Sequence, residues 1–341
     1  MFKGRRRAPV DPVTFTLDGA DVTAERGEPL AIALLAADKT IVARSPKLHR
    51  PRGPTCFRGA CDGCLARVDD APNVMTCLVP ARGGERVESQ NVVGSRKADL
   101  LRLTDWFFPQ GIDHHHLMAG VPALGEAMQA FAQKVAGLGR LPGQVQEIEA
   151  GARLEADVVV VGAGVAGMAV ASALSRAKLD VALVDDGLAP GGSLHGAPDV
   201  QSAVARRAPL DGVTLLARHV CAGAFLPSEA PRPPGDRADG VTLLVVDDAR
   251  AKLVTAPAIV LATGAHDGVV AAFGNDLPGV FSARALCRLL ASGLEPDGPI
   301  GVVRGEGAGF WGDELARRAG GGVSIGEAEL EGFAGRAHVS A

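Results

Sequence analysis

Aromatic residues and net charge are both scarce in this sequence. None of its 341 residues is Tyr, and the aromatic residues make up only 4% of the chain. Few aromatic rings are therefore available to stack on a ligand. The 35 Lys and Arg nearly balance the 39 Asp and Glu, which leaves a net charge of −4. A nucleic-acid partner, which would need a basic face, is not expected.

A long uninterrupted apolar run is also missing. The longest apolar stretch, residues 156–174, contains Asp157 and three regularly spaced glycines, which is typical of a strand, a loop and a helix rather than a membrane span. The start of the chain is basic at residues 5–7, but no apolar segment follows it, so a secretory signal is not indicated. We expect a reducing, cytoplasmic location, either free or attached to the inner membrane through a partner.

The first 95 residues predict a small mixed domain. Residues 13–24 alternate apolar and polar around Asp18-Gly19, which is a strong hairpin signal. An apolar-periodic helix is expected at residues 28–38, followed by a short strand at residues 40–45. Strands, one helix and a cysteine-bearing loop together suggest a β-grasp-like domain. From residue 97 to about residue 140 the pattern becomes helical, and the stretch up to residue 156 is expected to be a linker.

Four of the six cysteines occur within 22 residues of one another. Their spacing is Cys56-x4-Cys61-x2-Cys64-x12-Cys77, and the C-x4-C-x2-C opening is that of plant-type [2Fe–2S] proteins. A zinc site usually combines two short Cys pairs, and only one is present here. A disulfide framework is poorly supported without secretion. The spacing favours [2Fe–2S], with zinc and unmetallated thiols as alternatives, whereas the isolated Cys221 and Cys287 are expected in the core.

A Gly-rich turn follows the strand VVVV. Gly162, Gly164 and Gly167 form GxGxxG, and a helical pattern follows them. The glycines allow a tight turn, close approach to a pyrophosphate and close helix–strand packing, while the helix N-terminus faces the phosphates. Asp185 ends the next strand, 18 residues after Gly167, where a carboxylate can bind a ribose hydroxyl. Together these features predict a dinucleotide site.

Two further motifs favour FAD over NAD at this site. The segment LAPGGSL follows the acidic strand, and the apolar run PAIVL, expected to be a buried strand, ends in an Ala-Thr-Gly triplet. Both resemble two-dinucleotide-binding-domain flavoproteins, in which a strand ending in ATG lies by the flavin nucleotide. The predicted FAD-binding residues are Gly162, Gly164, Val165, Ala166, Gly167, Asp185, Asp186, Gly191, Gly192, Ser193, Leu194, Val220, Ala262, Thr263 and Gly264.

Several motifs in one order carry a wider resemblance. They are KLHRPRG, SQN, AGLGRLP, GAGVAG, PGGSL, ATGAHD and GNDLPGV, between about residues 12 and 290. In this respect the chain resembles the α subunit of heterotetrameric sarcosine oxidase, and still more its relatives in hydrogen cyanide synthase, opine oxidase and proline or hydroxyproline dehydrogenase complexes. The resemblance implies a subunit that carries FAD and takes electrons from a partner β subunit, which oxidises the amine. Sarcosine oxidase α subunits have lost the four cysteines, so their presence implies a dehydrogenase-type relative.

The last part of the sequence departs from that family. A second GxGxxG at Gly307, Gly309 and Gly312 is followed by Glu327, and only 14 residues come after it, too few for a complete second nucleotide domain. We expect a vestigial surface there rather than a working NAD(P) site, and the segment that completes the flavin domain in relatives is missing. The run of three histidines at residues 114–116 is expected in an interface or a solvated loop, because consecutive side chains cannot all face one ion.

The predicted fold is α/β plus α+β, an N-terminal β-grasp, ferredoxin-like [2Fe–2S] domain followed by a Rossmann-like FAD domain. The leading functional hypothesis is an electron-transfer subunit that passes electrons from a partner flavin subunit, through FAD and [2Fe–2S], to a quinone, a cytochrome, a ferredoxin or oxygen. The alternatives are a self-contained NAD(P)H-dependent reductase and a non-catalytic assembly subunit. No catalytic acid–base pair or nucleophile is predicted, and His266 and Asp267 either tune the flavin or belong to a plain loop. The expected domains are 1–95 ([2Fe–2S]), 96–156 (helical segment and linker), 157–298 (FAD) and 299–341 (vestigial second nucleotide region).

Overall fold

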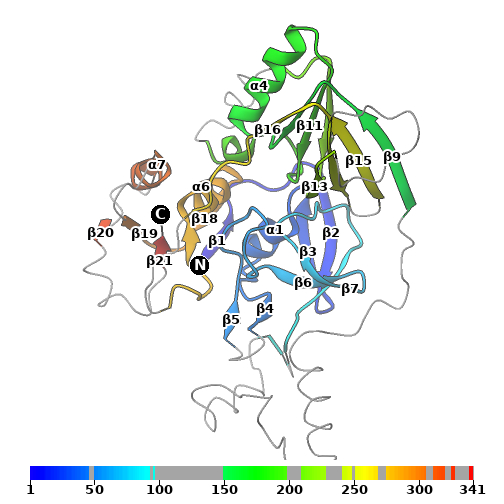
Figure 1. The fold of residues 1–341 in the computed structure, drawn as a ribbon. Helices are drawn as coiled ribbons and strands as arrows, with labels where there is room; N and C mark the ends of the chain where they lie inside the picture. Colours follow the sequence, from blue (N-terminus) through cyan, green and yellow to red (C-terminus); the bar gives the residue numbers. More distant parts are fainter. Residues whose placement is uncertain are drawn as a thin grey trace, which may run out of the picture. The chain divides into compact units, whose positions relative to one another are not determined.

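The computed structural model forms two compact units, Met1–Gly143 with Asp267–Ala341, and Gln144–His266. We call them the cysteine unit and the glycine-turn unit, and each is considered by itself (Figure 1). The predictions for the histidines at 114–116 and for Gly307, Gly309 and Glu327 lie outside the described residues. The structure describes residues 1–45, 50–92, 95–96, 149–197, 209–227, 240–247, 250–267, 274–304, 310–318, 324–326 and 338–340.

The cysteine unit is built on a mixed five-stranded sheet in the order β3-β2-β8-β6-β7. The β2–β3 hairpin turns at Asp18 and Gly19, whose φ angles are 50° and 81°, so the predicted hairpin is confirmed. Helix α1 packs on this sheet, and β8 runs parallel to β2, which gives a β-grasp arrangement. The elements are β2 (Pro12–Leu17), β3 (Ala20–Glu25), α1 (Leu30–Ala36), β6 (Leu65–Val68), β7 (Ala71–Met75) and β8 (Arg86–Glu88).

A second layer covers the other side of α1. The helix sequence LAIALLA is apolar all round, and a helix of that kind must be covered on more than one face. Leu30, Ala33 and Leu34 pack on the sheet, whereas Ile32 and Leu35 pack in a separate cluster. That cluster contains residues of α6 (Ala283–Ala291), which is capped by the Ser282 hydroxyl accepting from the Ala285 N–H at 3.3 Å. The sequence did not predict this partnership between the N-terminal domain and residues 281–302.

The remaining elements of the cysteine unit are short. Strand β1 pairs with β18, and β4 pairs with β5. A parallel sheet has the order β17-β21-β19-β20, and helix α7 packs against α6. Their bounds are β1 (Phe2–Arg5), β4 (Ala43–Arg44), β5 (Pro51–Arg52), β17 (Phe281–Ser282), β18 (Leu294–Pro296), β19 (Gly301–Arg304), α7 (Phe310–Arg318), β20 (Ser324–Gly326) and β21 (His338–Ser340).

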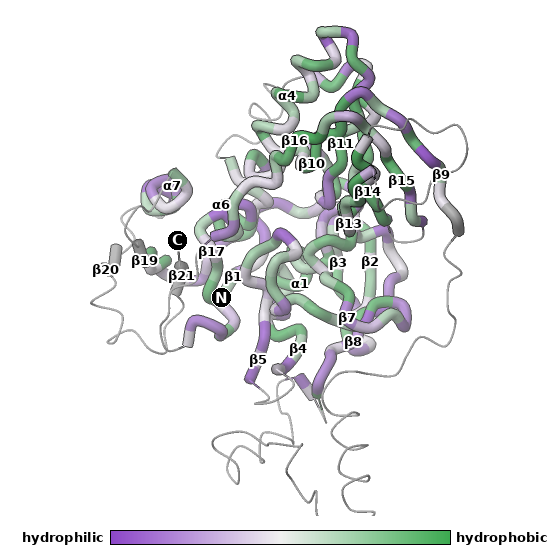
Figure 2. The backbone as a smooth tube through the Cα atoms, viewed as in Figure 1, coloured by the Kyte–Doolittle hydropathy of each residue, from purple (hydrophilic) through white to green (hydrophobic). Residues whose placement is uncertain are grey.

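The glycine-turn unit contains a parallel sheet in the order β12-β11-β10-β16. Val-rich strands β10 and β11 lie in its middle, as the hydropathy colouring indicates (Figure 2), and the predicted strand–turn–helix–strand unit is confirmed. The prediction of a buried strand at PAIVL is wrong in its burial, because β16 is an edge strand and its Leu261 is 76% exposed. The elements are β10 (Val158–Val161), α4 (Val165–Arg176), β11 (Val181–Asp185), the short helix η2 (Gly192–Gly196), β12 (Val213–Ala217) and β16 (Ala258–Leu261).

The second sheet of this unit has the order β13-β14-β15-β9. Residues 149–155, expected in a linker, form strand β9 parallel to β15. The pattern concealed this strand because Gly151 interrupts it, although glycine is needed there, since an added Cβ would lie 1.7 Å from the Ala251 carbonyl oxygen. None of the helices within the described ranges is both long and apolar enough to cross a membrane. The strands are β9 (Glu149–Glu155), β13 (Val220–Phe225), β14 (Val241–Val246) and β15 (Arg250–Ala256).

Candidate cofactor sites

The loop between β5 and β6 carries three of the clustered cysteines, and the fourth follows β7. Cys64 and Cys77 are buried at 1% exposure each, at the edge of the cluster that joins α1 to α6. Cys56 and Cys61 are half-buried. The β-grasp fold therefore brings together all four residues that the sequence predicted as metal ligands.

The four thiols are arranged as two pairs. Hydrogen bonding from Cys56 lowers the pKa of Cys61, and the same bond, with burial, raises the pKa of Cys56. Hydrogen bonding from Cys77 lowers the pKa of Cys64, and the pKa of Cys77 is raised in the same way. Among the described residues, no group of three or more His, Cys, Asp or Glu side chains is placed to hold a single ion. Two pairs of thiolates fit a centre of two irons, each with two protein sulfurs, better than one tetrahedral ion.

The backbone of the loop directs N–H groups at sulfur. Phe57 adopts a left-handed φ of 52°, and the N–H groups of Arg58 and Ala60 both donate to Cys56 Sγ at 3.4 Å. Such bonds stabilise negative charge on a metal-bound thiolate. Gly63 is required by close approach, because a Cβ there would lie 2.0 Å from the Gly53 carbonyl oxygen. The loop is thus shaped for thiolate ligands by its backbone as well as its cysteines.

One residue of this site was not predicted. Arg288 of α6 donates a hydrogen bond from Nη1 to the Phe57 carbonyl oxygen at 2.8 Å. The two residues are 231 positions apart, and no local pattern marks this arginine. Only the packing of α6 against the cysteine loop places them together.

The three glycines of the GxGxxG turn meet different surroundings. A Cβ on Gly162, whose φ is +105°, would lie 2.3 Å from the Ala262 carbonyl oxygen, and one on Gly167 would lie 1.7 Å from the Gly162 carbonyl oxygen. Nothing lies within 4 Å of the Cβ position of Gly164, the N-cap residue of the 12-residue helix α4. Gly162 and Gly167 are therefore needed by the fold itself. Gly164 instead leaves open space at a helix N-terminus, which suits a pyrophosphate.

Asp185, at the end of β11, is fixed against the same turn. Its carboxylate accepts hydrogen bonds from the Ala163 N–H at 2.6 Å and the Gly187 N–H at 2.9 Å. A carboxylate oxygen accepts more than one hydrogen bond, so capacity is left for ribose hydroxyls. The PGGSL segment also reaches the turn, because the Gly191 N–H donates to the Ala163 carbonyl at 2.8 Å.

The predicted FAD-binding residues gather at one edge of the parallel sheet. The Ala262 N–H donates to the Val161 carbonyl at 2.8 Å, which places the Ala-Thr-Gly triplet beside the Gly-rich turn. Val165 and Val220 are 55% and 52% exposed. Ser193 and Leu194 lie in η2, and Asp186 directly follows β11. The contacts of these residues with a ligand stay a prediction, whereas their gathering at the carboxyl ends of parallel strands is where such sites occur.

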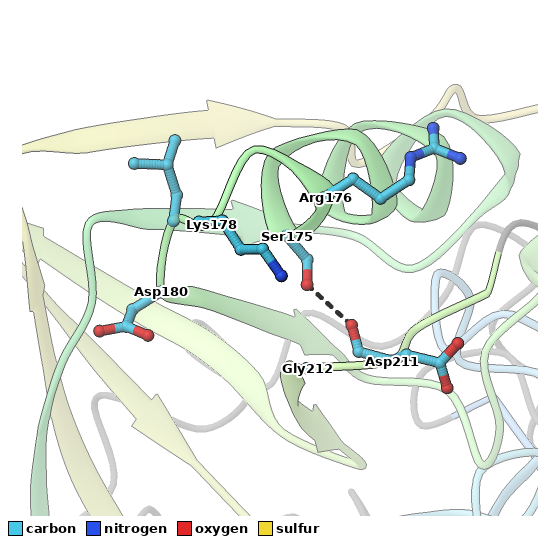
Figure 3. Close-up of a pocket in the computed structure, with 7 residues that line it drawn as sticks. Ser175, Arg176, Lys178, Asp180, Asp211 and Gly212 are labelled. Atoms are coloured by element: carbon cyan, nitrogen blue, oxygen red, sulfur yellow. Dashed lines mark hydrogen bonds between the residues drawn. The ribbon is translucent and has the colours of Figure 1, made fainter.

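The remaining polar candidates do not extend this site. Asp267 forms an ion pair with Arg284 at 2.9 Å. Cys287 is fully buried, as predicted, but Cys221 is only half-buried on β13. The depression in Figure 3 lies at the C-terminal end of α4 and the amino ends of β11 and β12, where the Ser175 hydroxyl donates to the Asp211 carbonyl at 2.7 Å. It is therefore at the opposite sheet edge from the Gly-rich turn, and we assign it no role.

Comparisons with known proteins agree with this division. Residues 10–92 match the family described as a 2Fe-2S iron-sulfur cluster binding domain, and residues 147–214 match the Thi4 family. The iron–sulfur match covers the β-grasp fold and all four clustered cysteines. The crystal structure of L-proline dehydrogenase from P. horikoshii is similar over 96% of this chain and 55% of its own, with a TM-score of 0.62 and 18% identity. The fold prediction is thereby confirmed.

Two curated proteins illustrate the sequence relationship. The sarcosine oxidase α subunit of Rhizobium meliloti (strain 1021) is 28% identical over 296 residues, which are 81% of this chain and 30% of that protein. An opine oxidase subunit of Agrobacterium tumefaciens (strain Ach5) is 31% identical over 163 residues, which are 43% of this chain and 31% of that protein. The chain thus spans about a third of the length of these relatives.

Proposed function

Because this chain is related to the sarcosine oxidase α subunits and to a subunit of opine oxidase, we propose that it is an electron-transfer subunit of an amine or amino-acid dehydrogenase or oxidase complex. The observation that carries the proposal is the presence of two cofactor sites in one chain, a loop with two thiol pairs and a dinucleotide turn with open space at Gly164. Each site matches one of the two carriers that such a subunit needs. Oxidation of the amine is assigned to a partner subunit.

Cys56, Cys61, Cys64 and Cys77 would hold a [2Fe–2S] cluster, and the edge of the parallel sheet around the Gly-rich turn would hold FAD. When bound, FAD accepts electrons in pairs, and a [2Fe–2S] cluster passes them on one at a time. The protein supplies the position and electrostatics of both groups. A partner subunit with a flavin of its own would supply the electrons, and small accessory subunits would complete the complex. A quinone, a cytochrome, a ferredoxin or oxygen would receive the electrons.

The protein's own groups have distinct tasks in this proposal. The N-terminus of α4 presents unpaired N–H groups and a positive dipole end to the FAD pyrophosphate. Asp185, fixed by the Ala163 N–H, accepts hydrogen bonds from the ribose. At the other site, the N–H groups of Arg58 and Ala60 stabilise the Cys56 thiolate. Proton transfer to or from a substrate is not among these tasks.

The test starts with the chain as isolated, together with any proteins that co-purify with it. We expect about one FAD and two irons per chain, with flavin absorption bands on a broad iron–sulfur envelope. Addition of an amine or amino-acid substrate to the intact complex should bleach both signals. A colourless protein that contains zinc would overturn the cluster assignment. Rapid bleaching of the isolated chain by NADH would instead favour a self-contained reductase, and absence of FAD would favour an assembly subunit.

A further inference from the structure

The Phe57–Arg58 peptide group connects the cysteine loop with helix α6. Its carbonyl oxygen accepts the hydrogen bond from Arg288 Nη1 at 2.8 Å, and its N–H donates to Cys56 Sγ at 3.4 Å. In a trans peptide the C=O and N–H point in opposite directions, so a partner that fixes one end also aims the other. Arg288 therefore controls the direction of an N–H that faces a predicted cluster ligand.

The conformation of this peptide needs support from outside the loop. Phe57 has a left-handed φ of 52°, which is unfavourable for a residue with a bulky side chain, and it is buried at 1% exposure. The burial of its ring and the hydrogen bond from Arg288 hold it in place. The base of α6 is itself fixed, because Leu286, Cys287 and Leu289 are buried beside it. The guanidinium is thus presented from a rigid helix.

The charge of Arg288 acts in the same direction as the hydrogen bond. Burial lowers the pKa of this half-buried guanidinium, and the negative charges of Cys77 and Cys56 act against that lowering. An arginine keeps its charge in proteins, so a positive charge is held close to the cysteine loop. Reduction adds negative charge to an iron–sulfur cluster, and a nearby positive charge stabilises the reduced form more than the oxidised form.

We propose that Arg288 is a positioning residue for the [2Fe–2S] cluster, which aims the Arg58 N–H at Cys56 Sγ and raises the reduction potential of the cluster. The inference rests on the cluster assignment in the proposed function, but it needs neither the partner subunit nor FAD. It assigns to α6, far along the chain, a part in setting the driving force for electron transfer. A purely structural arginine would tie α6 to the loop without changing the potential.

The test compares Arg288→Met and Arg288→Lys with the unaltered protein. Met keeps much of the length and removes the charge, whereas Lys keeps the charge but lacks the planar fork of donors. The matched control is Arg26→Met, which removes the same charge from an exposed pair with Asp11 in the same unit. Iron content, the midpoint potential from a redox titration followed by electron paramagnetic resonance, and the coupling of exchangeable protons to the cluster are measured for each.

We expect Arg288→Met to disfavour reduction about tenfold, a shift of about 59 mV to lower potential for one electron. Arg288→Lys should give a smaller shift in the same direction and a weaker proton coupling, and Arg26→Met should change neither. Potentials of both Arg288 variants within twofold of the unaltered protein, with two irons bound, would refute the inference alone. If Arg288→Met fails to assemble a cluster, Arg288→Lys decides, and an unchanged potential with unchanged coupling refutes it. Absence of iron from the unaltered protein would instead refute the proposed function.

Discussion

Two glycines of one turn, Gly164 and Gly167, should respond in opposite ways to the same substitution. Gly164→Ala places a methyl group where nothing lies within 4 Å. Gly167→Ala places one 1.7 Å from the Gly162 carbonyl oxygen and 3.3 Å from Ala262 Cβ. We therefore expect Gly164→Ala to weaken FAD binding without harm to the fold, and Gly167→Ala to disturb the fold whether or not FAD is present.

The sizes of these effects follow from the contacts. At Gly167 the clashing atom is backbone, so α4 must move away from β10, and overpacking of that kind costs about 1–3 kcal/mol or more. At Gly164, φ is −73°, which alanine adopts readily. The loss of a favourable N-cap residue and the stiffening of the unfolded chain nearly cancel there, which leaves the stability within about 0.5 kcal/mol. A methyl group against a bound pyrophosphate should weaken FAD binding about 10- to 100-fold, roughly 1.4–2.8 kcal/mol.

The assay separates local stability from binding. Hydrogen exchange of the peptides that cover β10 and α4 reports the stability of the turn in the FAD-free protein, and a fluorescence titration reports FAD affinity. Gly167→Ala should speed exchange in these peptides by about tenfold or more, because 1.4 kcal/mol corresponds to a factor of ten. Gly164→Ala should leave exchange unchanged. If Gly164→Ala bound FAD with unaltered affinity, the assignment of the open space to a pyrophosphate would be wrong.

Three further predictions concern the cysteine unit and the free thiols. Cys61→Ser and Cys64→Ser should each remove iron and electron output while FAD stays at about one per chain, since the two sites use different residues; loss of FAD in the iron and flavin analysis would contradict this. Iodoacetamide should label half-buried Cys221 before Cys287 near pH 8, because burial raises the pKa of Cys287 to about 11, and mass spectrometry of the labelled peptides would disprove it by the reverse order. Although burial opposes its ionisation, hydrogen bonds from two arginines of α7 hold the pKa of Glu314 below 4.5, so its stabilisation is complete above that pH and is lost as the pH falls through the lowered pKa. Thermal unfolding of Glu314→Gln should therefore depend less on pH on the acid side than that of the unaltered protein, and equal slopes would count against this reasoning.

Features set by local chemistry could be predicted from the sequence. Asp18-Gly19 has two residues that tolerate positive φ, so a hairpin follows from the dipeptide and the alternation around it. The strand–turn–helix–strand unit could be located because a glycine pattern, a strand period and a helix period coincide within 30 residues. The cysteine spacing predicted a loop that could bring four thiols together, and the β-grasp fold does so.

Features set by contacts between distant segments could not be predicted. Arg288 lies on a helix whose polar positions look like those of any solvent-facing helix, and its importance arises from Phe57, 231 residues away. Strand β9 was concealed because its glycine is explained only by the Ala251 carbonyl of the neighbouring strand. The exposure of β16 follows from its place at a sheet edge, whereas its composition is that of a buried strand. In each case the decisive neighbour belongs to another part of the sequence.

One unused signal in the sequence could have pointed to the α6 layer. The segment LAIALLA of α1 has no polar residue, and a helix that covers one face of a small sheet should keep a polar face toward water. Its apolar outer face therefore required a second covering element, which proves to be α6 together with the cysteine loop. Because Cys64 and Cys77 lie within this same apolar layer, the element that covers α1 also determines how dry the thiol pairs are. Burial and nearby charge both set the potential of an iron–sulfur cluster, so the packing of α6 and the charge of Arg288 are two consequences of one contact.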